Sequence, residues 1–264
     1  MPRRFGELRA LAVRPNYETA TKYGHYYTDR LGIQPAEAAG ILIIDLAEKD
    51  CTKTLFDYRV KNDNPIMVFG CGHGNQTLFT GQNGFPLLSR GRPEDHQLMM
   101  GRCGSFLSCS FGFGAPYWVA QGMRGFYGYS RTFYFMIISF PNYYAEWFFK
   151  AHYAFDQALF KGRSWEEAWA DSDVVWKDFL PRAPAACQRH LLWDYESRIK
   201  ANEPGYTPFK PAPPPPPKYI CPWDDFEGSA EEVKAHIKAD HAPYLVDACI
   251  LPQPIRGWIR CKLP

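Results

Sequence analysis

A histidine and a cysteine each follow a short apolar run in this chain, and together they could perform thiol nucleophilic catalysis. His73 lies between two glycines after the run at residues 65–69, and Cys109 follows the run at residues 105–107. Only the thiolate of a cysteine attacks a carbonyl carbon, and a nearby imidazole can hold that thiolate or carry its proton to a leaving amine. The residue types therefore predict Cys109 as nucleophile and His73 as its acid–base partner.

The two runs are typical of buried strands, which would place both side chains at one edge of a sheet. In α/β proteins, the carboxyl ends of parallel strands carry the chemistry. The glycines beside His73 would let backbone N–H groups approach a substrate oxygen closely. A lone buried cysteine is usually inert and a lone histidine usually structural. The order of strand, Gly-His-Gly, crossover, strand and Ser-Cys favours the catalytic interpretation of the pair.

Several short motifs around this pair resemble a known group of enzymes. Gly-His-Gly at residues 72–74 and Leu-Ser-Cys-Ser at residues 107–110 look like the His–Cys dyad of the caspase-like cysteine peptidases, the group of caspases, gingipains, legumain and separase. Residues 101–104 resemble the stretch that leads into the cysteine strand, and residues 120–129 resemble the helix and strand that follow it. The resemblance covers roughly residues 9–135. Many members of this group carry an acidic residue just before the end of the strand that leads to the nucleophile. This chain has Leu-Ser at that place.

The resemblance implies a cysteine endopeptidase that cleaves a protein or peptide substrate without a catalytic cofactor. It also implies a caspase-like α/β three-layer sandwich with a mainly parallel sheet. By analogy with the group, the backbone N–H groups of Gly74 and Cys109 would hold the oxyanion. Residues 75–92 and 127–131 are candidates for the specificity pocket. Arg131 could accept an acidic side chain or could equally be a surface cation.

Apolar runs and helical periodicity predict the elements that must position these residues. A strand–helix alternation over the first half of the chain predicts a parallel sheet with helices on both faces. The expected strands cover residues 8–13, 40–46, 65–69, 105–107, 125–129 and 132–139, with the second buried on both faces. The expected helices cover residues 16–31, 50–61, 95–100, 115–123, 142–160, 164–180 and 185–200. Asn16 would cap the first helix and Gly32 would end it. The N-terminus of the helix at 115–123 would favour the Cys109 thiolate.

The composition is that of a soluble globular protein of 264 residues with 46% hydrophobic and 22% charged residues. The formal net charge of +2 argues against nucleic acid as a partner. The eight cysteines are scattered, which fits a reducing compartment better than a disulfide scaffold. No hydrophobic signal segment follows the basic start, and residues 132–144 are too short and polar to span a bilayer. We therefore expect a cytoplasmic protein without a membrane partner.

The domain organisation predicted from composition has four parts. A catalytic domain covers residues 1–203, a proline-rich linker residues 204–218, a zinc-finger-like module residues 219–245 and a tail residues 246–264. The five consecutive prolines at 213–217 predict a semi-rigid polyproline II spacer. Alternatively, this linker, called the proline-rich arm below, could be a ligand for a domain that binds proline-rich motifs.

The C-terminal module resembles a classical zinc finger in part. Cys221, His236 and His241 fit the second half of a two-Cys-two-His motif, and Asp224 stands where the second cysteine should be. Aspartate can ligate zinc, so these four residues predict a structural Zn²⁺ site, with Cys249 as a further candidate ligand. The alternative is a degenerate finger that packing alone holds together.

Two other functions remain open at the level of sequence. The chain could be a non-catalytic caspase-like interaction module that recruits a partner protein through the proline-rich arm or the finger. It could also be a finger-bearing nucleic-acid binder, which the near-neutral charge disfavours. The presence of both His73 and Cys109 argues for the peptidase, because a scaffold needs neither.

Overall fold

The computed structural model describes residues 8–210, 219–220, 227–228, 231–233, 235–236 and 251–252. The chain divides into two compact units, Met1–Lys210 and Pro211–Pro264. Tyr206 and Phe209 are buried in the first unit, where their rings contact those of Trp165 and Phe160. In the second unit, β9 (Tyr219–Ile220) pairs antiparallel with β10 (Glu227–Gly228) and β11 (Leu251–Pro252).

A six-stranded sheet with the order β2-β1-β3-β6-β7-β8 forms the centre of the first unit. The first five of these strands are parallel, and β8 pairs antiparallel with β7. The bounds are β1 Arg9–Arg14, β2 Leu42–Ala47, β3 Met67–Cys71, β6 Cys103–Leu107, β7 Gly125–Tyr129 and β8 Arg198–Asn202. Every residue of β3, β6 and β7 is buried, as expected for central strands covered on both faces.

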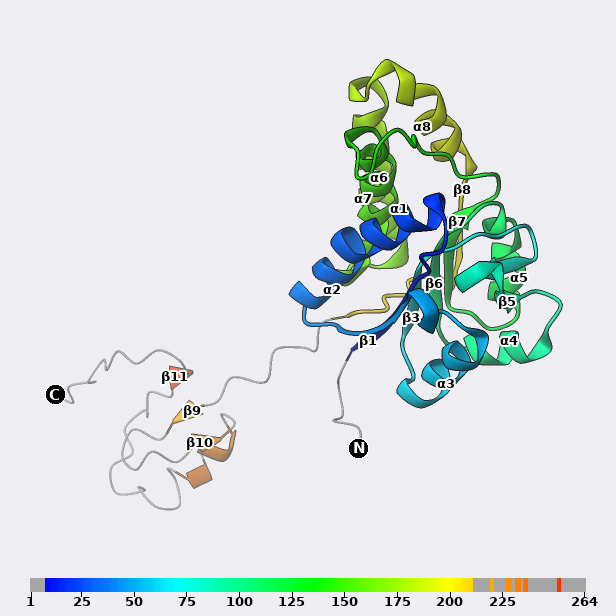
Figure 1. Ribbon diagram of the computed structural model, residues 1–264. Helices are drawn as coiled ribbons and strands as arrows, with labels where there is room; N and C mark the ends of the chain where they lie inside the picture. Colours follow the sequence, from blue (N-terminus) through cyan, green and yellow to red (C-terminus); the bar gives the residue numbers. More distant parts are fainter. Residues whose placement is uncertain are drawn as a thin grey trace. The chain divides into compact units, whose positions relative to one another are not determined.

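Helices cover both faces of the sheet and give three layers (Figure 1). One face is covered by α1 Thr19–Tyr27, α2 Gln34–Ala38, α6 Tyr143–Phe160 and α7 Trp165–Arg182, with α8 Ala185–Ser197 packed against them. The other is covered by α3 Lys53–Asp63, α4 Pro93–Met99 and α5 Ala115–Ala120, together with the hairpin of β4 Leu78–Thr80 and β5 Pro86–Ser89. The predicted α/β class with a mainly parallel sheet is confirmed.

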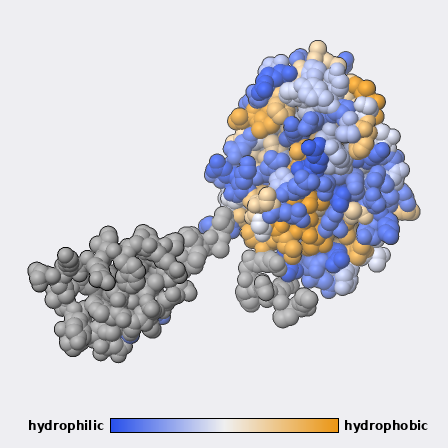
Figure 2. Space-filling model, turned by 60° about the vertical axis from the view of Figure 1, so that its left-hand side comes forward, coloured by the Kyte–Doolittle hydropathy of each residue, from blue (hydrophilic) through white to orange (hydrophobic). Residues whose placement is uncertain are grey.

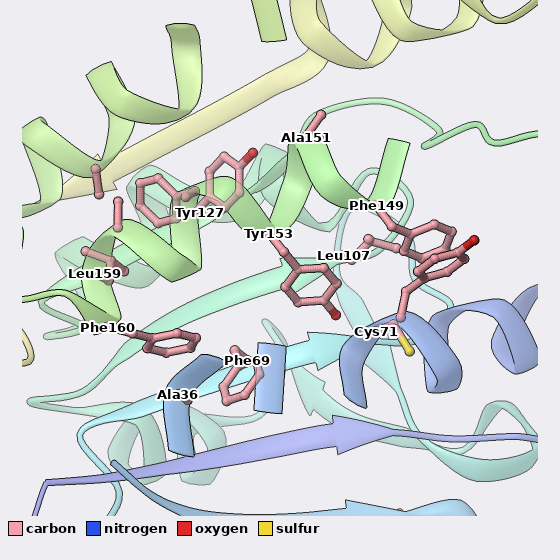
Figure 3. Close-up of a cluster of buried hydrophobic side chains, with 14 of the residues drawn as sticks. Ala36, Phe69, Cys71, Leu107, Tyr127, Phe149, Ala151, Tyr153, Leu159 and Phe160 are labelled. Carbon is pink, nitrogen blue, oxygen red and sulfur yellow. The ribbon is translucent and has the colours of Figure 1, made fainter. Parts of the chain in front are cut away.

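Successive side chains of the central strands point alternately into two separate hydrophobic cores. In β3, Met67 and Phe69 point into the core under α6, whereas Val68 points into the core under α3. Figure 3 shows the first core, where Phe69, Tyr153 and Phe160 lie between the sheet and the surrounding helices. This period of two is what a strand buried on both faces requires.

Two expectations about the strands are wrong. Residues 132–139 form no strand but an irregular segment, and β8 takes the sixth place in the sheet. The predicted helix at 185–200 therefore ends at Ser197, where the chain turns to pair with β7. The second strand is not buried on both faces, because β2 is an edge strand and Leu42 is 44% exposed.

The first helix also differs from the expectation at both ends. Glu18, not Asn16, caps it, and the cap is reciprocal with Thr21. Gly32 does not end it, since a π-helical turn at Thr28–Ile33 continues directly into α2. A β-carbon at Gly32 would lie 2.7 Å from the ring of Phe69. The glycine therefore permits close helix–sheet packing instead of stopping the helix.

The described part of the chain contains no membrane-spanning helix. None of the described helices combines the length and the apolar character needed to cross a bilayer. On the face that Figure 2 shows, hydrophilic residues predominate and hydrophobic areas lie between them.

The core under α6 contains a buried histidine and a buried aspartate. His152 and Asp156 are both fully buried, and the Tyr129 hydroxyl lies 3.0 Å from His152 Nδ1. Both carboxyl oxygens of Asp156 lack a hydrogen-bond partner among the described residues. Burial lowers the pKa of His152 to about 3 and raises the pKa of Asp156 to about 8. Both groups are therefore mainly neutral at pH 7.

This burial predicts a pH dependence of stability that Asp156→Asn should reduce. In the unfolded chain Asp156 ionises above about pH 4, but in the folded chain it keeps its proton up to about pH 8. Its contribution to the free energy of unfolding therefore falls as the pH rises between these values, by up to about 1.4 kcal/mol per pH unit. Urea unfolding from pH 5 to pH 8 should show a stability that declines less in the variant than in the wild type.

The matched control for this experiment is Asp178→Asn on the neighbouring helix α7, where the carboxylate is 47% exposed. We expect it to change the slope much less than Asp156→Asn does. Equal slopes in wild type and Asp156→Asn would mean that Asp156 is ionised inside the fold.

Candidate functional site

The fold brings His73 and Cys109 to the same edge of the sheet. Strands β3 and β6 are parallel neighbours in which Cys71 pairs with Leu107, so each candidate residue lies two positions past a paired strand end. The Gly72 N–H donates to the Leu107 carbonyl at 3.2 Å and continues this alignment beyond the ladder. His73 and Cys109 both line one open pocket. The two strands therefore deliver the predicted pair to one site.

The glycines beside His73 allow its loop to lie directly against the cysteine segment. A β-carbon on Gly74 would lie 2.1 Å from Ser108 Oγ and 3.3 Å from the Cys109 carbonyl oxygen. The His73 carbonyl accepts from the Thr80 N–H at 2.9 Å, which ties the loop to the β4–β5 hairpin. No larger residue fits at position 74 without moving the two segments apart.

A third residue, Glu18, contacts the histidine. The distance from His73 Nε2 to Glu18 Oε1 is 2.9 Å, and the same carboxylate oxygen accepts from the Thr21 N–H as the cap of α1. Partial burial raises the pKa of Glu18, but the donors Thr21 and His73 outweigh it and hold the pKa below its usual value. An ionised carboxylate can only accept, so Nε2 carries a proton and Nδ1 is left to accept one in the neutral ring.

Sequence reasoning missed Glu18 because the residue lies 55 positions before His73. The spacing of Glu18 and Thr21 indicates a helix N-cap. It does not indicate that Glu18 contacts a histidine elsewhere in the chain. Contact with His73 arises only because α1 packs beside β3.

Cys109 is partly accessible, and its thiol donates toward the Phe133 carbonyl at 4.0 Å. Burial raises the pKa of this thiol above its ordinary value. The helix expected after Cys109 begins at Ala115, as predicted, but α5 (Ala115–Ala120) is short and the 3₁₀ turn η4 (Phe111–Gly114) lies between it and Cys109. The resting thiol at neutral pH is therefore protonated.

The other described cysteines are poorer nucleophile candidates than Cys109. Cys51, Cys71, Cys103 and Cys187 are all buried. Burial raises the pKa of Cys51 and of Cys71 to about 12, and raises the pKa of Cys103 and Cys187 as well. Among the five described thiols, Cys109 alone is not buried.

The walls of the pocket differ from the expected ones. Tyr127 and Tyr129 are fully buried in the core, and the Arg131 guanidinium lies 4.9 Å from the centre of the Trp193 ring. None of these three residues lines the pocket, and neither does any residue of 75–92. Phe133, Phe135 and Phe149 line it instead, together with residues 20, 21 and 24 of helix α1.

The predicted zinc site lies largely outside the described residues. Cys221, Asp224, His241 and the further candidate Cys249 are not described, and His236 lies half-buried in a helical turn. Within the described parts of the chain, no group of three or more histidine, cysteine or acidic residues could hold a metal ion. The zinc site stays a prediction.

The fold and the site together define an α/β protein with a cysteine and a histidine in one pocket at the carboxyl edge of a mainly parallel sheet. No known protein-family model matches the chain, and no curated protein matches it in sequence.

Proposed function

We propose that this protein is a cysteine peptidase of the caspase-like type, with Cys109 as nucleophile and His73 as acid–base residue. One observation supports the proposal: the sole described thiol that is not buried shares a pocket with a histidine whose Nε2 lies 2.9 Å from a carboxylate oxygen. A nucleophile, a base and a residue that orients the base are the minimum set for nucleophilic acyl transfer.

The reaction begins with a neutral thiol, because burial raises the pKa of Cys109. His73 Nδ1 takes the Sγ proton as Sγ bonds to the scissile carbonyl carbon, and the carbonyl oxygen becomes an oxyanion. The imidazolium then gives this proton to the departing amine while the C–N bond breaks and leaves a thioester. Water, deprotonated by the same imidazole, hydrolyses the thioester and restores the thiol.

Glu18 and the Gly74 loop support these steps. The Glu18 carboxylate fixes the ring through Nε2 and stabilises the imidazolium that forms at each proton transfer. The backbone N–H groups of Gly74 and Cys109 belong to segments that lie against each other, and in the proposal they bind the oxyanion.

Cysteine alkylation tests this proposal without knowledge of the substrate. We expect iodoacetamide to modify Cys109 at neutral pH faster than the four buried cysteines, and His73→Ala to slow this reaction at Cys109 alone. Peptide mass spectrometry gives each rate. A Cys109 that reacts as slowly as Cys71, and at the same rate in His73→Ala, would mean that no catalytic dyad exists.

Glu18→Gln separates the catalytic role of Glu18 from its capping role. Glutamine retains an oxygen that can accept from the Thr21 N–H, but it cannot neutralise an imidazolium. We expect kcat/KM to fall about tenfold, while the free energy of unfolding changes by less than about 1 kcal/mol.

Glu18→Ala is the comparison for Glu18→Gln, since it also removes the cap and should destabilise the fold by about 1 kcal/mol. If Glu18→Gln retains full activity and an unchanged alkylation rate at Cys109, Glu18 is a helix cap only.

The alternative function is a non-catalytic module of the same type that binds a partner protein through the proline-rich arm or the finger. The raised pKa of Cys109 is the observation in its favour, because it lowers the fraction of thiolate at neutral pH. An unreactive Cys109 in the alkylation experiment would favour this alternative.

A further inference from the structure

Apart from His73 and Cys109 themselves, the pocket beside Cys109 has a mainly apolar lining that includes three phenylalanines. Phe133, Phe135 and Phe149 form its wall, and Ala20, Gly24 and Leu107 add small or aliphatic surface. No lysine, arginine, aspartate or glutamate is among the lining residues, and Thr21 and Ser108 add only uncharged hydroxyls. Figure 3 shows Phe149 and Leu107 close to Cys71 at one end of the hydrophobic core. The pocket is thus an open continuation of that core.

The wall is held rigidly by its own ring contacts. The centres of the Phe135 and Phe149 rings lie 5.1 Å apart at an angle of 66°. The ring centres of Tyr23 on α1 and Phe135 lie 5.3 Å apart, and those of Tyr129 and Phe133 lie 4.7 Å apart. Phe133 and Phe149 are buried. A wall fixed in this way selects by shape and polarity, because it cannot turn a charged group toward a ligand.

Two charged residues considered for this site, Glu18 and Arg131, already have partners. Glu18 accepts from both His73 and Thr21, and Arg131 stacks on Trp193. A charged substrate side chain in this pocket would lose its hydration without gaining a lysine, arginine, aspartate or glutamate partner from the lining, which is strongly unfavourable. An apolar side chain would gain from the same burial.

The geometry points to a substrate preference for an uncharged apolar residue, such as leucine or phenylalanine, on the amino side of the scissile bond. This inference rests on the proposed peptidase function and deepens it. The carbonyl that Cys109 attacks belongs to the residue whose side chain occupies the pocket, so the lining selects the bond that is cleaved.

Irreversible peptide probes test the preference at Cys109 itself. In acetyl-Ala-Ala-X-chloromethyl ketones, the thiolate forms a C–S bond and chloride leaves. Mass spectrometry of the full chain gives the labelling rate of Cys109 for X = Leu, Phe, Asp, Lys and Arg, each divided by the iodoacetamide rate. We expect Leu and Phe to label at least tenfold faster than the three charged residues.

Two variants connect the preference to the lining. Ala20→Phe should fill the pocket and reduce the Leu and Phe rates at least tenfold, whereas Thr19→Phe, on the exposed side of the same helix, should not. Phe135→Arg should shift the preference toward Asp. Because Ala20 and Phe135 lie on different segments, failure of one variant to fold leaves the other informative.

The outcomes distinguish the inferred substrate preference from the proposed peptidase function. If the Asp, Lys or Arg probe labels Cys109 fastest, the inferred preference is wrong and the peptidase proposal stands. If no peptide probe labels Cys109 faster than iodoacetamide does, the peptidase proposal fails and the preference fails with it.

Discussion

Replacing Cys109 by alanine is expected to abolish peptide cleavage, with a loss of at least about 10³-fold in kcat/KM. The reason is that no other described thiol is accessible to take over the attack. Sγ is only partly buried and makes one long contact to the Phe133 carbonyl. The free energy of unfolding should therefore change by less than about 1 kcal/mol. Cleavage of a mixed peptide library, followed by mass spectrometry, and urea unfolding measure the two effects.

Other cysteine variants make this result specific. Cys187→Ala removes a buried thiol on α8 outside the pocket and should keep the activity. His73→Ala should be as inactive as Cys109→Ala, because the two residues act on the same proton. Loss of activity in Cys71→Ala or Cys103→Ala, together with an active Cys109→Ala, would show that a different thiol is the nucleophile.

The largest effect on stability is expected at Gly70 in the central strand β3. Gly70 has a φ of +136°, and a β-carbon there would lie 2.0 Å from the Val13 carbonyl oxygen of β1. Alanine must therefore strain its own backbone and push apart two paired strands. We expect Gly70→Ala to lower the free energy of unfolding by more than about 4 kcal/mol or to prevent folding.

Gly40→Ala is the matched control for this prediction. Gly40 also has a positive φ, of +78°, but a β-carbon there would meet no atom within 4 Å. Its replacement should therefore destabilise the fold only by about 1–2 kcal/mol, from backbone strain alone. Urea unfolding of the two variants separates the cost of backbone strain, which both share, from the cost of the steric clash with β1, which only Gly70→Ala has. Equal losses would mean that β1 can move away from β3 at little cost.

A loss at Gly70 would also affect the site, because β3 carries His73. The same strand pairs with β1 on one side and with β6 on the other. Its displacement would change the alignment of the His73 loop with Cys109. Partial activity in a folded Gly70→Ala would show how much displacement the site tolerates.

Much of the architecture could be predicted because local patterns encode it. The continuous apolar runs that became β3 and β6 and the amphipathic periodicity of α6 and α7 each reflect which faces are buried. The errors fell where neighbours decide the outcome. The strand at 198–202 forms because β7 offers a free edge, and β2 is exposed because none of the described strands pairs with its outer edge.

The sequence by itself determined that His73 and Cys109 follow strands, since the apolar runs and the glycines lie next to them in the chain. Only the tertiary structure decided what surrounds them. Glu18 reaches His73 from the start of α1, and three phenylalanines from two distant segments line the pocket. Packing also raised the pKa of Cys109 where a helix terminus was expected to favour the thiolate. The physical reason is that periodicity is local, whereas desolvation and contact depend on residues that the fold brings from far along the chain.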